Sequence, residues 1–242
     1  MTVMKNRARL YNFSDGSGFR GKATSEVFNE IHDRKAWNIE TFESASGEGS
    51  SLVQTAVLIE ELPPVLKKLG VKSLLDLPCG DFHWMQHVPM PGVLYTGADI
   101  VASLVENNHS KYAGEHRQFI LANLLTDELP AEDLIFCRDC LVHFSFRNIE
   151  LALQNIRRSE ARYLAITHFP EEAENHDIIT GGWRPLNFCR APFHFPYPQI
   201  LINEKCTERG GAFSDKSLAI WQVEKLPLTS QSPPPPGRNS GR

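Results

Sequence analysis

The stretch Ser73–Met85, S-L-L-D-L-P-C-G-D-F-H-W-M, constrains the fold more than any other part of the chain. It begins with an apolar run, Ser73–Leu77, that is long enough for a buried strand and ends abruptly at Pro78-Cys79-Gly80-Asp81. A buried strand followed by an acidic residue and a glycine turn is typical of an open α/β sheet. Such sheets bind nucleotides beyond the carboxyl end of the strand, against the backbone N–H groups of the turn.

The glycine fingerprint of dinucleotide-binding folds, G-x-G-x-x-G, is absent from this turn. Gly80 is its one glycine, and Pro78 and Phe82 occupy the positions where further glycines are needed. Because these side chains obstruct the close approach of the backbone to a pyrophosphate, the sequence argues against NAD and FAD.

Apolar runs recur after this stretch at the spacing of strands joined by crossover segments. Strands that alternate with helical segments predict a Rossmann-like three-layer α/β sandwich with a mostly parallel sheet. Two later runs, Gln199–Lys205 and Lys216–Leu226, are expected to add a closing antiparallel terminal strand. The five earlier strands are expected to be centred on Leu74, Tyr95, Phe119, Leu134 and Leu164.

A helix is expected before the first strand, over residues 52–70. Ser51 and Gln54 have the spacing of a capping box at its start. Pro63-Pro64 is expected to break or kink this helix, because proline removes a backbone donor and collides with the preceding turn.

Length, composition and charge limit the possible classes of protein. The 242 residues, 41% hydrophobic and 22% charged, suit one globular domain, expected over 44–226, with a polar extension or lid at 1–43 and a disordered proline-rich tail at 227–242. The net charge of −4 argues against a large nucleic-acid-binding face. No apolar run has membrane-spanning length, the N-terminus has no signal-peptide core, and the five cysteines are an odd number. We therefore expect a cytoplasmic protein with free thiols and no membrane partner.

Polar residues follow the ends of the expected strands. Because the carboxyl ends of parallel strands share one edge of a sheet, these residues are expected to meet there. Asp99 lies close to the position, about 20 residues after the turn, where a carboxylate accepts ribose hydroxyls. The residues expected at this edge are Asp81, Asp99, Asn123, Asp139, His143 and His168.

The segment 170–198 interrupts this alternation and is rich in aromatic residues and prolines. A long loop beside such an edge is typical of a lid or a specificity element. We expect Trp183, Arg184 and Asn187 to contact a substrate, and the alternative is that the loop is a hydrophobic cover for the sheet.

The pattern D-L-P-C-G-D resembles motif I of the class I S-adenosylmethionine (SAM)-dependent methyltransferases. Together with S-G-E-G-S-S, G-G-W-R-P-L-N-F and P-F-H-F-P, it resembles a bacterial group of these enzymes, and the resemblance covers residues 44–226. The resemblance implies SAM as cofactor. The residues that it implies for the cofactor are Asp76, Pro78, Cys79, Gly80, Asp81, Trp84, Asp99, Ile100, Asn123, Leu124 and Asp139.

The expected reaction is methyl transfer to an oxygen, or less favourably a nitrogen, of a small-molecule acceptor. A hydroxyl acceptor needs a general base, for which His143 and His168 are the candidates, with Asp139 orienting the imidazole or facing the methionine part of SAM. Either histidine could instead be structural. Asn123 could meet the adenine amino group or simply end a strand.

Other functions are disfavoured or left as alternatives. The motif of adenine methylation, N-P-P-Y, is replaced by R-D-C-L, which argues against a nucleic-acid substrate. The remaining histidines lack ligand spacing, so no metal is predicted. A SAM-binding module without catalytic activity, serving regulation, is the principal alternative, because motif I is imperfect. A sugar-nucleotide epimerase is disfavoured by the missing glycine fingerprint.

Overall fold

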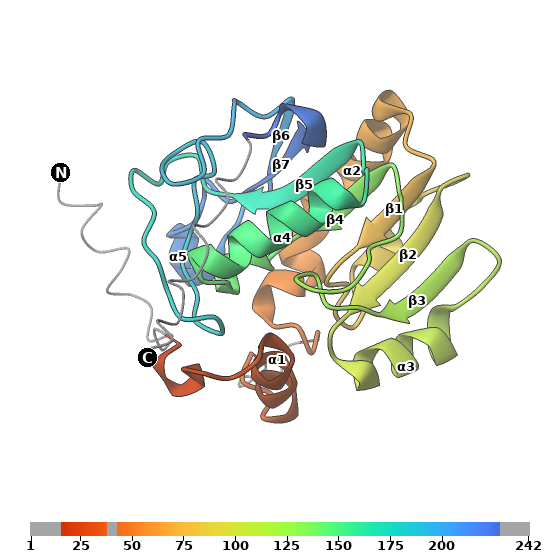
Figure 1. Cartoon of the computed structure of the whole chain (residues 1–242). Helices are drawn as coiled ribbons and strands as arrows, with labels where there is room; N and C mark the ends of the chain where they lie inside the picture. Colours follow the sequence, from red (N-terminus) through yellow and green to blue (C-terminus); the bar gives the residue numbers. More distant parts are fainter. Residues whose placement is uncertain (1–15, 38–42, 228–242) are drawn as a thin grey trace, which may run out of the picture.

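The computed structural model describes residues 16–37 and 43–227, and within them seven strands form one sheet. The strand order is β3-β2-β1-β4-β5-β7-β6 (Figure 1). Strands β1 to β5 run parallel to one another, and β7 lies antiparallel between β5 and β6. The predicted fold class is therefore confirmed. The strands are β1 (Ser73–Asp76), β2 (Leu94–Asp99), β3 (Arg117–Leu121), β4 (Leu134–Cys137), β5 (Tyr163–His168), β6 (Ile200–Asn203) and β7 (Ser217–Gln222).

Helices flank this sheet, and short 3-10 turns join several of the elements. In Figure 1, α4 crosses the near face of the sheet and α1 lies below it. The described α-helices are α1 (Thr24–Asp33), α2 (Leu52–Leu69), α3 (Ala102–Tyr112), α4 (Phe146–Arg158) and α5 (Glu208–Gly211). The 3-10 turns are η2 (Ser17–Phe19), η3 (Glu48–Ser50), η4 (Met85–His87), η5 (Leu141–His143) and η6 (Val223–Lys225).

The two faces of the sheet carry separate hydrophobic cores, because successive strand residues point to opposite sides. Leu74 packs with the stripe of leucines on α2 and with Val105 of α3. Its neighbour Leu75 packs instead with α4 and with aromatic side chains of the loop 170–198. The sheet is thus the middle of three layers. Because both of its faces are covered, a ligand site is expected at the carboxyl ends of the parallel strands.

The helix α2 continues through Pro63 and Pro64, so the predicted break at these prolines is wrong. Leu58, Leu62 and Leu66 are fully buried on one face of α2, at spacings of one helical turn. This stripe spans the prolines and anchors both halves of the helix to the sheet, which outweighs the local cost of the missing N–H donors. Ser51 caps the helix as predicted, accepting the N–H of Gln54.

The aromatic loop 170–198 covers the α4 face of the sheet over part of its length. Leu186, Phe188 and Phe195 are buried in that core, and the indole N–H of Trp221 donates to the carbonyl of Pro196 at 2.8 Å. This part agrees with the alternative of a hydrophobic cover. Other residues of the same loop reach the carboxyl edge.

Most of the predicted terminal segments lie outside the described residues. The predicted tail lies beyond the described residues apart from Pro227, and so do residues 1–15 and 38–42 of the predicted extension. None of the helices in 16–37 and 43–227 is long and apolar enough to cross a membrane.

Candidate ligand pocket at the carboxyl edge of the sheet

A pocket of about 360 Å³ lies at the carboxyl ends of β1, β2 and β4. Its walls also include α1, the loop 45–50 and Lys216, the residue before β7. This volume is in the range of small-molecule sites. The residues expected from sequence that line it are Asp76, Pro78, Cys79, Gly80, Asp81, Trp84, Asp99, Ile100, Asn123, Leu124, Asp139, His143 and Trp183.

Gly80 and Asp99 join the turn after β1 to the end of β2. The Asp99 carboxylate accepts the N–H of Gly80 and the N–H of Val101, each at 3.0 Å. Gly80 has φ of +55°, and a Cβ there would lie 2.4 Å from the Oγ of Ser46. Burial raises the pKa of Asp99. The turn therefore requires glycine, and Asp99 is a buried carboxylate on the pocket wall.

Asp81 holds the start of the loop 45–50 beside the turn after β1. Its carboxylate accepts the hydroxyl of Ser44 at 3.0 Å and the backbone N–H of Ala45 at 2.7 Å. Ser44 in turn accepts the N–H of Ser46 at 3.1 Å. The second acid of D-L-P-C-G-D thus fixes a loop far away in the sequence, and it also lines the pocket.

Asp76, the last residue of β1, is buried and faces the pocket. The hydroxyl of Tyr95 donates to its carboxylate at 2.6 Å. Burial, with a smaller contribution from the nearby charge of Asp99, raises the pKa of Asp76 to about 8. Asp76 is therefore mostly protonated at neutral pH unless a cation binds beside it.

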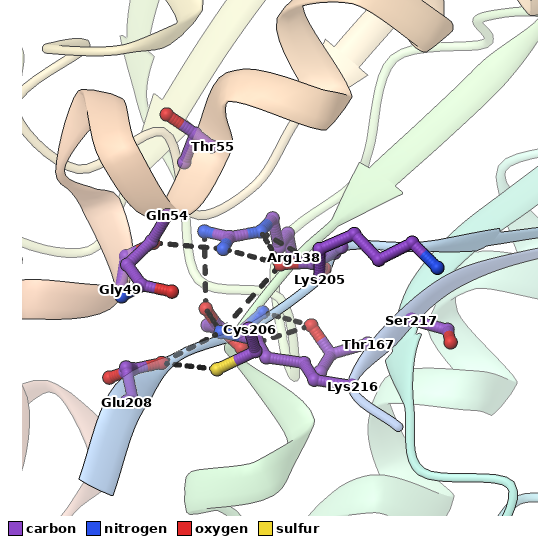
Figure 2. Close-up of polar contacts among 12 residues, drawn as sticks. Gly49, Gln54, Thr55, Arg138, Thr167, Lys205, Cys206, Glu208, Lys216 and Ser217 are labelled. Atoms are coloured by element: carbon purple, nitrogen blue, oxygen red, sulfur yellow. Dashed lines mark hydrogen bonds and ion pairs between the residues drawn. The ribbon is translucent and has the colours of Figure 1, made fainter. Parts of the chain in front are cut away.

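A cluster of charged side chains lies beside the loop 45–50 (Figure 2), with Arg138, Glu204 and Lys216 buried and Asp139 and Glu208 partly exposed. Arg138 contacts Glu204 at 2.7 Å and Asp139 at 3.1 Å, and it donates to the carbonyl of Gly49 at 2.8 Å. Lys216 contacts Asp139 at 2.7 Å, with Glu204 and Glu208 at 3.8 and 3.6 Å. Arg138 and Lys216 hold the pKa of Asp139 well below its usual range despite burial. Asp139 is therefore ionised.

His143 faces the pocket from η5, just beyond β4. It is 9% exposed, and its Nδ1 lies 2.8 Å from the carbonyl oxygen of Gly182. Because a carbonyl can only accept, Nδ1 carries the proton and Nε2 keeps a lone pair. Burial lowers the pKa of His143 to about 4. The imidazole is therefore neutral at physiological pH, and no residue of the described part hydrogen-bonds Nε2.

Three residues expected at the site have other surroundings. His168 is buried against Trp221, and its Nδ1 accepts the N–H of Phe188 at 3.2 Å. Arg184 donates to backbone carbonyls after β4. Asn187 binds the carbonyls of Pro170 and Glu172 within the aromatic loop, at 3.0 and 2.9 Å. The three side chains are not among the described residues that line the pocket.

Other pocket residues did not emerge from the sequence. Phe28 and Ile31 of α1 line the pocket, as does Trp37, whose ring lies 4.8 Å from that of His143. Lys216 and Glu208 belong to the wall with the charged cluster. A signal existed for Lys216, because a charged residue at the start of an otherwise apolar run needs a partner when the run is buried.

No family model and no curated protein matches this chain. PigF, solved with S-adenosylhomocysteine, superimposes with a TM-score of 0.55 and 13% identity over 91% of this chain and 68% of its own. The mitomycin 7-O-methyltransferase MmcR superimposes with a TM-score of 0.51 and 11% identity over 76% of this chain. This chain has the Rossmann-like fold of class I methyltransferases. It spans a little over half of MmcR, 57% of that chain.

Proposed function

We propose that this protein transfers the methyl group of SAM to an oxygen of a small-molecule acceptor, with nitrogen the less favoured target. The observation that carries the proposal is the meeting of Asp99 and His143 in one pocket. The first is a buried carboxylate at the strand end where nucleosides are bound. The second is a neutral imidazole whose Nε2 has no hydrogen-bond partner among the described residues. The bound S-adenosylhomocysteine of PigF and the O-methyltransferase activity in the name of MmcR support this choice.

The chemistry of the pocket wall fits SAM. Each oxygen of the Asp99 carboxylate accepts one backbone N–H, so each retains capacity for a ribose hydroxyl. Ile100, Asn123 and Leu124 would hold the adenine beside it. Asp76, with its raised pKa, would gain from the ammonium group of the methionine part, since a cation favours the ionised carboxyl.

When bound, SAM supplies an electrophilic methyl group on a sulfonium. In our proposal, Nε2 of His143 accepts the proton of the acceptor hydroxyl, and the neutral state of the imidazole at physiological pH makes this possible. Asp139 stays ionised at the same wall and raises the proton affinity of the imidazole. Trp37 and Trp183 provide apolar walls that exclude water and orient the acceptor.

Isothermal titration calorimetry tests the cofactor site. SAM and S-adenosylhomocysteine are expected to bind and NAD is not, and Asp99→Ala is expected to abolish binding. Asp133→Asn is the matched control, because Asp133 also accepts backbone N–H groups but at the opposite edge of the sheet. If a folded Asp99→Ala protein bound SAM as tightly as the wild type does, the proposal would be wrong.

Turnover separates an enzyme from a SAM-binding module. Production of S-adenosylhomocysteine is measured with a panel of hydroxyl and amine compounds, using wild type and His143→Gln. An enzyme of the proposed kind loses about 100-fold or more in kcat with the hydroxyl acceptor when its base is removed. Binding without turnover across the panel would support the regulatory alternative instead.

A further inference from the structure

The segment Leu141–Phe144, which presents His143, is held by residues 181–184 of the aromatic loop. The N–H of Gly181 donates to the carbonyl of His143 at 2.9 Å, and the N–H of Arg184 donates to the carbonyl of Val142 at 3.1 Å. Two backbone hydrogen bonds therefore attach the aromatic loop to His143 and to Val142, the residue before it.

The Arg184 side chain adds hydrogen bonds to the same segment. One terminal nitrogen donates to the carbonyls of Leu141 and Val142 at 3.0 and 2.7 Å, and the other donates to the carbonyl of Phe144. These three carbonyls flank His143 on both sides. Because η5 is a single short turn, its buried carbonyls have few partners of their own, and the guanidinium supplies them.

This arginine is buried without an ion pair. It is 7% exposed, and in 16–37 and 43–227 no carboxylate lies within ion-pair distance of it. Burial lowers the pKa of Arg184 to about 9, and the more distant charge of Asp177 opposes this shift. A buried cation without a carboxylate is costly, and apolar residues are often as stabilising at such places. The hydrogen bonds to the carbonyls around His143 are therefore what offsets the cost of burying this guanidinium.

The same loop also sets the proton on the imidazole. The carbonyl of Gly182 accepts from Nδ1 of His143 at 2.8 Å, which leaves Nε2 unprotonated. Trp37 packs against the ring from another side, at 4.8 Å between centroids. Gly181 has φ of +101°, and a Cβ there would lie 2.7 Å from Val27 of α1, so α1 and the loop fit closely at this point.

We propose that Arg184 and the Gly182 carbonyl form a positioning device for His143. Arg184 fixes the backbone that carries the imidazole, and the Gly182 carbonyl selects the tautomer in which Nε2 is unprotonated. This inference rests on the proposed role of His143 as the base. Arg184 is then a positioning residue, which acts through His143 without touching the acceptor.

The tautomer of His143 gives a test that needs no activity. Nitrogen-15 NMR of protein labelled at histidine, with the His143 signals assigned through His143→Gln, distinguishes protonated Nδ1 from protonated Nε2. The expected result for wild type is Nδ1–H for His143. His168 serves as an internal reference with the opposite tautomer, because its Nδ1 accepts a hydrogen bond. A wild-type His143 protonated at Nε2 would overturn the proposal.

Variants of Arg184 test the positioning. Arg184→Gln is expected to mix the tautomers of His143 and to lower kcat by about 10- to 100-fold, while KM for SAM stays within about twofold. Arg184→Lys is expected to restore part of kcat, since it keeps the charge and some carbonyl contacts. Arg162→Gln is the control, because Arg162 is half exposed and pairs with Asp133 at the far edge.

The outcomes separate this inference from the proposed function. If Arg184→Gln leaves both the His143 tautomer and kcat unchanged, the positioning role is wrong. If the protein shows no methyl transfer but Arg184→Gln still shifts the tautomer, the positioning holds and the proposed function fails. Should Arg184→Gln not fold, the wild-type tautomer and the Arg184→Lys spectrum decide the matter.

Discussion

The backbone N–H of Gly80 donates to the carboxylate of Asp99 across 3.0 Å, and this bond ties the first turn of the pocket to the second strand. The two residues are 19 positions apart in sequence. Because the carboxylate also accepts the N–H of Val101, one side chain fixes the backbone of two pocket loops. The pocket geometry therefore depends on a glycine that lets the backbone approach closely.

Replacement of this glycine is expected to damage both stability and binding. Gly80→Ala places a Cβ 2.4 Å from the Ser46 hydroxyl at φ of +55°, so we expect a loss of more than about 1–2 kcal/mol in the free energy of unfolding, and weaker S-adenosylhomocysteine binding. Urea denaturation and calorimetry measure the two effects. Gly92→Ala is the control, because Gly92 has φ of +74° but open space around it. Equal losses in both variants, with unchanged binding, would contradict the role of Gly80.

The buried charged cluster is expected to respond strongly to the loss of one cation. Lys216→Met leaves Asp139 and Glu204 with Arg138 as their remaining cation among the described residues, and it removes the contact of Lys216 with Glu208 (Figure 2). Breaking a fully buried ion pair on one side costs about 3–5 kcal/mol, but the Asp139 side chain is 27% exposed, so we expect a smaller loss of about 2–3 kcal/mol in urea denaturation. Lys68→Met, at an exposed position of α2, should change stability by less than about 0.5 kcal/mol.

The carboxyl of Asp76 is expected to make the protein less stable as pH rises. Its pKa is raised from 3.8 to about 8, chiefly by burial, so between these values the folded state holds a proton that the unfolded state has lost. Stability therefore falls between about pH 4 and pH 8. Asp76→Asn removes this dependence and should raise Tm at pH 8 by at least about 2 °C relative to wild type.

Thermal melts at pH 5 and pH 8 check this prediction, with a second aspartate of opposite behaviour as the control. The N–H groups of Lys72 and Ser73 and the charge of Arg162 outweigh partial burial and lower the pKa of Asp133. Asp133→Asn should therefore cost stability at neutral pH, and that cost should disappear at low pH. If Asp76→Asn raises Tm by the same amount at pH 5 as at pH 8, the Asp76 carboxyl of the wild-type protein is ionised at both pH values. That result would contradict the prediction.

The imidazole of His143 is expected to stay neutral well into the acid range. Burial lowers the pKa of His143 to about 4, and Arg184 and Lys216 add to this while Asp139 opposes it. Between pH 4 and 6.5 the unfolded state binds the proton and the folded state does not, so this group makes the fold less stable as pH falls. An NMR titration should show the His143 signal unchanged from pH 8 to 5.5. Titration near pH 6.5 would mean that the ring is solvated.

Several features of the fold were predictable from local patterns. The apolar runs around Leu74, Tyr95 and Leu164 gave the strands, because buried parallel strands read as continuous apolar stretches. The location of Gly80 and Asp99 at one edge of the sheet was predictable because the carboxyl ends of parallel strands lie on the same side. The continuity of α2 was not predictable in this way. The packing of its leucine stripe outweighs the tendency of Pro63 and Pro64 to break a helix.

What the sequence determined by itself was the succession of strands, the turn at Gly80 and the rim on which polar side chains gather. What only the tertiary structure decided was which of those side chains reach the pocket. His143 follows β4 and His168 is the last residue of β5, but His168 packs against Trp221 and the aromatic loop. Lys216 meets Asp139 because β7 inserts beside β5. Strands buried on both faces carry no alternation that reveals side-chain direction, and distant pairings appear only once the chain has folded.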